Sequence, residues 1–170
     1  MSPDLPPLPW QKIISGAQTG ADRGGLEAAY DLNLARGGWA PQEWRAEDGQ
    51  IPPWYRDGMR ESASRAYTVR THQNVQEGDA TLILSLGELT AESGSMLTAN
   101  LARRLRKPCR HVVIPGDGTL AGVALDRTAA WIEQIRPRIL NVAGPRESKE
   151  PGLQAATRKA IAVLFHATRR

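Results

Sequence analysis

The chain has 170 residues, of which 41% are hydrophobic and 24% are charged, and its formal net charge is +4. These values are typical of a soluble globular protein, and the longest apolar runs, such as residues 81–86, are far too short to cross a bilayer. The mild basic excess favours anionic ligands but does not require them. One cysteine and three histidines exclude an internal disulfide and argue against a multi-histidine metal site.

The N-terminal segment MSPDLPPLPW is rich in proline. We therefore expect a flexible, extended arm over residues 1–11, followed by a single domain over residues 12–170. The segment lacks the basic start and the apolar stretch of a signal peptide. Together with the lone Cys109, this predicts a cytoplasmic location.

Short apolar segments alternate with helical patterns from this point on. Residues 12–15 (KIIS) predict a first strand, and a glycine-rich turn then leads into a helix over 22–34. We expect that helix to bury Tyr30 on its apolar face. A brief strand around 38–40 and a long loop over 41–58 follow.

The second half of the chain repeats the alternation. A short helix is expected over 71–76, and residues 80–86 (ATLILSL) predict a buried strand. Beyond them the pattern predicts helices over 95–106, 120–135 and 153–167 and strands over 110–114 and 138–142. This alternation predicts an α/β fold with a doubly wound, mostly parallel sheet and helices on both of its faces.

The first candidate site is the turn between the first strand and its helix. A glycine-rich turn that opens a helix directs backbone N–H groups and the helix dipole at one point, which favours a phosphate. Asp22 is expected to cap the helix, and Arg23 to add a fork of donors to the anion. An ordinary strand-to-helix turn explains the pattern equally well, since it is neither GxGxxG nor a Walker sequence. The candidate residues are Gly16, Ala17, Gln18, Thr19, Gly20, Asp22 and Arg23.

A second turn of the same kind opens the helix expected over 95–106. There Gly94 permits close approach of a ligand, and Ser95 either contacts phosphate or simply caps the helix. After the last strand, Arg146 is a candidate anion clamp and Asn141 a candidate partner for a ring, unless this segment is a solvated loop. Segments that follow parallel strands meet at the carboxyl edge of the sheet, where ligands of such folds bind.

Five blocks of this sequence carry a family resemblance: GAQTGADRGGLEAA, GGWAPQEWRAEDGQIP, RTHQNVQEGDATLIL, ESGSMLTA and NVAGPRESKEPG. In this order they resemble the molybdenum-carrier family, also described as the circularly permuted YpsA-related branch of the SLOG superfamily. The similarity extends from Lys12 to His166. It implies a Rossmann-like fold that binds a molybdopterin-like or nucleotide-like phosphorylated ligand, often as a homo-oligomer.

Two departures from this family's relatives bear on chemistry. The family usually has two glycines where this chain has Gly16 and Ala17. Related phosphoribohydrolases carry a catalytic glutamate, and the alignment places Thr98 at that position. A threonine does not replace a carboxylate, so the resemblance does not imply the same hydrolysis.

The long loop contains several aromatic and acidic residues. We expect Trp39 in the core, and Trp54 and Tyr55 either at a subunit interface or in a lid over a heterocycle. The adjacent carboxylates of Glu47 and Asp48 are expected to be solvated unless they serve as acid–base groups.

Two function classes remain. The leading expectation is a carrier that binds molybdenum cofactor or a nucleotide, in which any metal arrives on its ligand and no side chain coordinates it. The alternative is a nucleotide-processing enzyme, with an acid–base group among Asp22, Glu47, Asp48 and Glu92, or a sensor of a nucleotide derivative. No catalytic residue is assigned. A basic run at residues 103–110 lies mainly at a predicted helix end and has no interleaved aromatic residues, so we do not expect nucleic acid as a partner. We expect no membrane partner either, because the apolar runs are short.

Overall fold

The structure is a computed structural model that describes residues 10–169. Its sheet consists of β1 (Lys12–Ile14), β2 (Ala35–Ala40), β5 (Met59–Glu61), β6 (Ala80–Ser85), β7 (Cys109–Val113) and β8 (Ile139–Ala143). The strand order is β5–β2–β1–β8–β6–β7, and every pairing in this sheet is parallel. The turns that follow these strands therefore open at one edge of the sheet.

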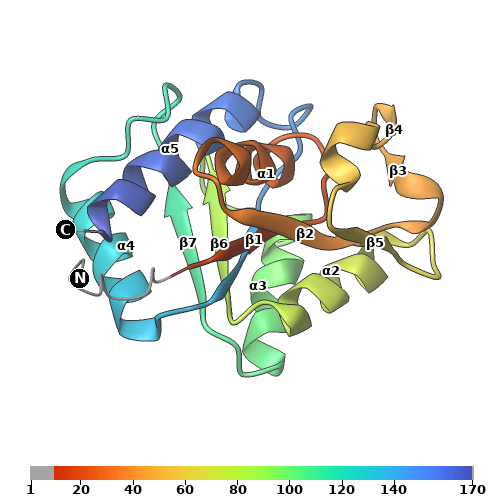
Figure 1. The fold of residues 1–170 in the computed structure, drawn as a ribbon, viewed down its shortest axis with the longest axis horizontal. Coiled ribbons are helices and arrows are strands. Elements are labelled where there is room, and N and C mark those ends of the chain that lie inside the picture. The colour runs from red at the N-terminus through yellow and green to blue at the C-terminus, as the bar shows by residue number, and fades with distance from the viewer. Residues whose placement is uncertain (1–9, 170) are drawn as a thin grey trace, which may run out of the picture.

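Five helices flank the sheet: α1 (Ala21–Asp31), α2 (Tyr67–Glu77), α3 (Gly94–Arg104), α4 (Gly122–Ile135) and α5 (Leu153–Ala167). Helices α1 and α5 pack together on one face, with α4 beside α5, and α2 and α3 cover the other face (Figure 1). The predicted doubly wound, parallel α/β fold is confirmed. None of the helices within residues 10–169 is long and apolar enough to span a bilayer.

The main core contains Trp10, which is fully buried. Its ring lies edge-on to Phe165 at 5.5 Å between centroids, and its Nε1–H donates to Thr168 Oγ1 at 3.3 Å. The predicted arm over residues 1–11 is therefore too long at its C-terminal end, because Trp10 already packs in the core against the last helix. Residues 1–9 of that arm lie outside the described part of the chain.

The predicted first helix is too long at its C-terminal end. Helix α1 stops at Asp31, and Asn33 takes a left-handed φ of 57°, which turns the chain into β2. Tyr30, expected inside, is 61% exposed, because the buried face of α1 is formed by small residues and Leu26.

The predicted loop over 41–58 contains regular structure. It includes two short 3-10 helices (Gln42–Trp44 and Pro53–Arg56) and an antiparallel hairpin of β3 (Arg45–Ala46) and β4 (Gly49–Gln50). Ile51 is fully buried beside Leu26 in a second, smaller core. Trp39, expected in the core, is only partly buried, and its Nε1–H donates to Glu77 Oε2 at 2.7 Å. Helix α2 begins four residues earlier than the predicted 71–76.

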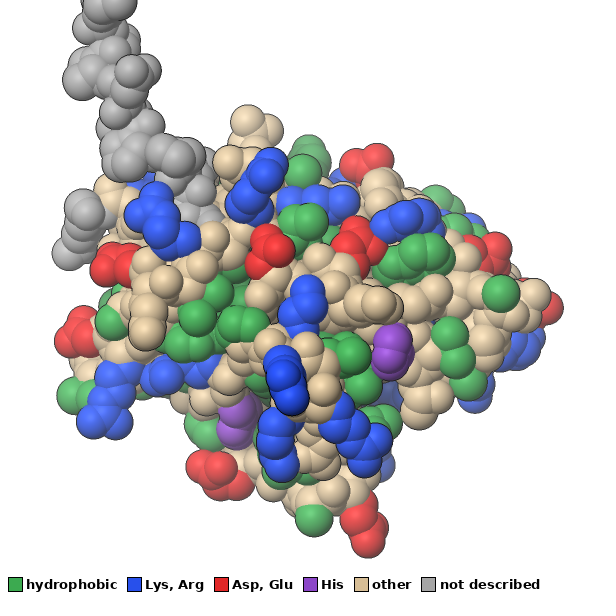
Figure 2. All heavy atoms as spheres, turned by 90° about the horizontal axis from the view of Figure 1, so that it is seen from below, with side chains coloured by type: hydrophobic (Ala, Val, Ile, Leu, Met, Phe, Trp, Pro, Cys, Tyr) green, Lys and Arg blue, Asp and Glu red, His purple; other side chains and the backbone are tan. Residues whose placement is uncertain are grey.

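Basic side chains gather at one place on the face shown in Figure 2, among scattered acidic and apolar ones. Arg103 and Arg104 form the basic last turn of α3, where cations interact favourably with the helix dipole. This position agrees with the helix-end interpretation of the basic run.

Candidate functional site

A pocket of about 550 Å³ opens at the carboxyl edge of the sheet. Its wall combines the β1–α1 turn, the β6–α3 loop, the β8–α5 loop and the N-terminal part of α2. A volume of this size is typical of small-molecule sites. Charged side chains of both signs line it: Asp22, Glu88, Glu92 and Glu150, and Arg70, Arg146 and Lys149.

The N-terminus of α3 lies in the pocket wall. Ser93 is the N-cap residue, and its Oγ accepts the Met96 N–H at 3.1 Å. The expectation that Ser95 caps this helix is therefore wrong by two positions. The N–H groups of Gly94 and Ser95 have no hydrogen-bond partner within residues 10–169, and both residues line the pocket. Two free N–H groups at a helix N-terminus form an anion-binding feature.

The β1–α1 turn is organised differently, because several of its N–H groups are used within the protein. The Gln18 N–H donates to Asp22 Oδ2, and the Gly20 N–H to Gln154 Oε1, each at 3.3 Å. The Ala21 N–H donates to the Pro145 carbonyl at 3.3 Å. The N-cap of α1 is Gly20, so Asp22 is not the capping residue and instead folds its carboxylate back over the turn.

Asp22 and Arg70 form an ion pair at the base of the pocket. Asp22 is 3% exposed, and its Oδ2 lies 3.3 Å from Arg70 Nη1. Burial raises the pKa of Asp22, although the guanidinium of Arg70 opposes this shift. A Cβ on Gly16 would lie 2.0 Å from Arg70 Nη1, so the glycine makes room for this pair.

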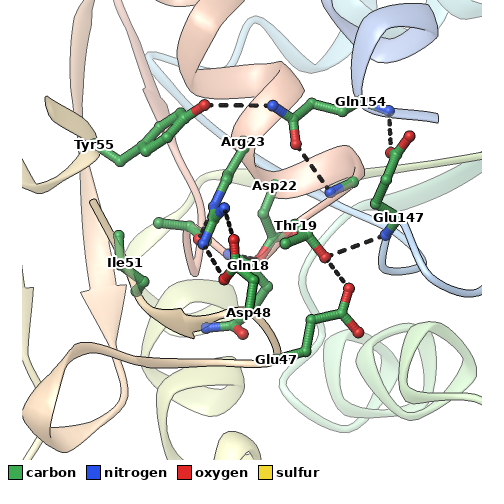
Figure 3. Close-up of polar contacts among 12 residues, drawn as sticks. Gln18, Thr19, Asp22, Arg23, Glu47, Asp48, Ile51, Tyr55, Glu147 and Gln154 are labelled. Carbon is green, nitrogen blue, oxygen red and sulfur yellow. Dashed lines mark hydrogen bonds and ion pairs between the residues drawn. The ribbon is translucent and has the colours of Figure 1, made fainter. Parts of the chain in front are cut away.

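Arg23 and Thr19, expected to contact an anion, are bound to the loop that carries the acidic pair (Figure 3). Arg23 donates to both oxygens of Asp48, at 2.7 and 2.9 Å, and these bonds lower the pKa of Asp48. The Thr19 hydroxyl donates to Glu47, which also accepts the Ser148 hydroxyl at 2.6 Å. Glu47 and Asp48 are exposed, as expected, and their carboxylates also tie the hairpin to the β1–α1 turn.

Hydrogen bonds also decide the protonation of Glu47. Its partial burial opposes ionisation, but the bonds from Ser148 and Thr19 outweigh that effect and lower its pKa. A second carboxylate, that of Glu147, accepts the N–H groups of Gly152 and Gln154 and so satisfies the N-terminus of α5. This network fixes the β8–α5 loop that carries Arg146.

The structure thus divides the predicted site residues. Five of them line the pocket, namely Gln18, Asp22, Gly94, Ser95 and Arg146. Gly16 lines a much smaller cavity beside it. The other four lie outside both walls and are Ala17, Thr19, Gly20 and Arg23. The buried Ala17 has a left-handed φ of 53°, a conformation that glycine adopts more readily.

Helix α2 supplies four pocket residues that were not among the predicted site residues, namely Tyr67, Thr68, Arg70 and Thr71. Arg70 lies in the first turn of α2, and the guanidinium of Arg146 stacks 4.3 Å from the ring centroid of Tyr67. No local pattern marks these residues, because only the packing of α2 beside the sheet edge brings them to the pocket. Asn141, expected to contact a ring, instead donates to Thr81 Oγ1 at 3.1 Å in the interior.

Two further features limit the chemistry of the pocket. Thr98 lines the pocket, and its hydroxyl donates to the Gly94 carbonyl at 3.0 Å. Because this residue is a threonine, the position aligned with the catalytic glutamate of related phosphoribohydrolases carries no carboxylate. Within residues 10–169, no group of three or more His, Cys, Asp or Glu side chains is arranged to hold a metal ion. The groups directed at a ligand are therefore N–H donors, guanidiniums and single carboxylates.

Comparison with known proteins identifies the family to which this chain belongs. Residues 13–165 match the circularly permutated YpsA SLOG family. A solved structure from Syntrophus aciditrophicus SB, named "Putative molybdenum carrier protein", is similar with 36% sequence identity and a TM-score of 0.79, over 91% of this chain and 94% of that chain. The chain has no significant match among curated proteins. The family match covers nearly the whole chain, and the protein belongs to the circularly permuted YpsA SLOG family.

Proposed function

We propose that the protein binds a phosphorylated small molecule in the pocket at the sheet edge and acts as a carrier of molybdenum cofactor. One observation carries this proposal: the free N–H groups of Gly94 and Ser95 and the guanidinium of Arg146 line the same pocket. A helix N-terminus and an arginine are the donors that proteins commonly direct at phosphate. The likeness to a protein named as a molybdenum carrier supports the choice of ligand.

The donor set of the pocket suits such a ligand. The start of α3 and Arg146 would hold its phosphate, and Gln18 and Arg70, each with a buried polar atom that lacks a partner, would contact its remaining polar groups. The sulfur atoms of the cofactor itself hold the molybdenum. The chain's own task is then to bind and orient the ligand. We further propose a homo-oligomer, which the resemblance implies, and a cytoplasmic location, which the N-terminal segment and the single cysteine favour.

The test substitutes the glycine at the start of α3. A Cβ on Gly94 meets no atom within 4 Å, so Gly94→Asp is expected to leave the fold intact while placing a carboxylate against the phosphate. Gly116→Asp is the matched control, because Gly116 has equally open surroundings and lies outside the pocket. Native mass spectrometry of the purified proteins then reports any retained ligand and the number of subunits.

We expect the wild type and Gly116→Asp to retain a molybdopterin-sized mass with a molybdenum isotope pattern, and Gly94→Asp to lose it. Retention of that mass by a folded Gly94→Asp variant would remove the start of α3 from the site. A retained nucleotide in place of a pterin would favour the alternative below.

A nucleotide-processing enzyme, or a nucleotide sensor, is the second candidate, and Asp22 favours the enzyme. A buried carboxylate with a raised pKa in a pocket wall is a common arrangement for an acid–base group. The protein is incubated with nucleoside monophosphates, and release of base or phosphate is measured by chromatography. Release that is lost in Asp22→Asn and kept in Asp117→Asn, a surface control, would support the enzyme. Absence of product would count against it.

A further inference from the structure

Two buried polar atoms in the pocket wall lack hydrogen-bond partners. Among the described residues, four buried side-chain atoms are in this condition: Gln18 Oε1, Arg36 Nη1, Arg70 Nε and Thr157 Oγ1. Gln18 and Arg70 line the pocket, whereas the other two residues do not. Leaving a buried polar atom unpaired costs about 1–3 kcal/mol, so such an atom in a pocket wall is a candidate partner for a bound ligand.

The orientation of the Gln18 amide is fixed by its surroundings. Its Nε2 donates to the Arg45 carbonyl at 2.9 Å and to the Gly16 carbonyl at 3.3 Å. A flipped amide would place Oε1 against these two carbonyl oxygens, so the unpaired atom is the oxygen and the site offers an acceptor. Gln18 is 2% exposed, and it is one of the residues that line the pocket.

Arg70 offers the opposite polarity nearby. Its Nη1 is paired with Asp22, but its Nε–H has no acceptor. The same Asp22 oxygen accepts both the Gln18 N–H and the Arg70 guanidinium, at 3.3 Å each, so the two residues flank one atom. A ligand that satisfies both unpaired atoms must bring both an acceptor and a hydrogen-bond donor.

On the basis of the proposed function, we infer that the pocket selects organic phosphates that carry an N–H or amino donor, and that Gln18 is the residue that recognises this donor. A bare oxyanion such as molybdate has acceptor atoms only. It would leave Gln18 Oε1 unpaired and would meet the carboxylates of Glu88, Glu92 and Glu150 in the same wall. The pocket volume of about 550 Å³ also suits a heterocycle with its phosphate better than a tetrahedral ion.

The test compares probes that differ in this donor. Isothermal titration calorimetry at mildly alkaline pH, where a phosphate ester is fully ionised, measures binding of the four common nucleoside monophosphates, phenyl phosphate and sodium molybdate. Phenyl phosphate is the matched control, because it is an organic phosphate without a donor. We expect at least one nucleoside monophosphate to bind roughly five- to tenfold more tightly than phenyl phosphate or molybdate, as one added hydrogen bond predicts.

Substitution of Gln18 assigns the effect to this residue. We expect Gln18→Leu and Gln18→Met to weaken that nucleotide by roughly five- to tenfold and to leave the affinity for phenyl phosphate unchanged. Equal weakening of both probes would make Gln18 a structural residue and overturn the inference. So would molybdate or phenyl phosphate binding as tightly as the best nucleotide. If neither phenyl phosphate nor any nucleotide binds, the inference fails, whereas the proposed function is decided separately by the mass that the purified protein retains.

Discussion

Gly20 and Gly94, both predicted to face a phosphate, should respond in opposite ways to replacement by alanine. Gly20 has a φ of 85° and a ψ of −132°, which side-chain-bearing residues rarely adopt. A Cβ there would lie 2.4 Å from the Pro145 carbonyl oxygen and 2.8 Å from the Glu147 nitrogen. A Cβ on Gly94 would meet nothing within 4 Å. Gly20 is thus a packing residue, whereas Gly94 borders open space.

The magnitudes follow from these contacts. At Gly20 the backbone strain costs about 1–3 kcal/mol, and forcing a methyl group against two backbone atoms adds about 1–3 kcal/mol. We therefore expect Gly20→Ala to lower the free energy of unfolding by about 2–6 kcal/mol, against a typical total of about 5–15 kcal/mol. At the first residue of α3, Gly94→Ala should change it by no more than about 0.5 kcal/mol, because alanine favours the helix and meets no obstacle.

Urea denaturation followed by circular dichroism measures both variants, provided that their denaturant slopes match that of the wild type. A loss of about 2 kcal/mol corresponds to a Tm lower by about 4 °C or more for a chain of this size. If Gly20→Ala unfolds within about 0.5 kcal/mol of the wild type, the close packing of the β1–α1 turn against the β8–α5 loop is refuted. A large loss in Gly94→Ala would refute the open surroundings of that residue.

Two further predictions concern aromatic side chains. Trp10→Ala should destabilise the fold by about 3–5 kcal/mol in the same urea assay, because Trp10 fills the core against Phe165. The control is Trp54→Ala, at a 45% exposed position, which should have little effect. Similar losses of stability in both variants would contradict the packing of Trp10. Burial and the Glu27 carboxylate raise the pKa of Tyr55 to about 12, so an absorbance titration should show a late phenol that is missing in Tyr55→Phe. Because the unfolded chain loses this proton first, near its ordinary pKa of 10, stability should fall as the pH rises from about 10 to about 12, and a flat profile there would contradict the assignment.

The parts of the fold that the sequence predicted well are those with strong local signals. Helix α5 was expected over 153–167 and has these bounds, because its apolar residues recur with helical spacing and a glycine precedes it. Strand β6 is a mainly apolar run and is buried along its whole length between β8 and β7. The hairpin of β3 and β4 was missed, since strands of two residues carry no periodicity.

For the site, the same reasoning located the edge of the sheet but not the partners of each side chain. The glycine-rich turns were visible as sequence motifs, and both lie at the predicted edge. Whether a turn offers its N–H groups to a ligand depends on what else reaches them. At the first turn Asp22 and Gln154 accept the N–H groups of Gln18 and Gly20, whereas at the second turn those of Gly94 and Ser95 have no partner within residues 10–169.

The sequence by itself determined the parallel α/β architecture and the three segments that meet at one end of the sheet, because strand and helix periods and glycine-rich turns are local properties of the chain. Only the tertiary structure decided which donors and acceptors face the pocket. Arg23 is bound to Asp48, which lies 25 residues away in the sequence, and does not line the pocket, whereas the packing of α2 places Arg70 in the pocket wall. Hydrogen-bond pairing between distant segments leaves no trace in local composition, so the chemistry of the site emerges only when the segments are placed side by side.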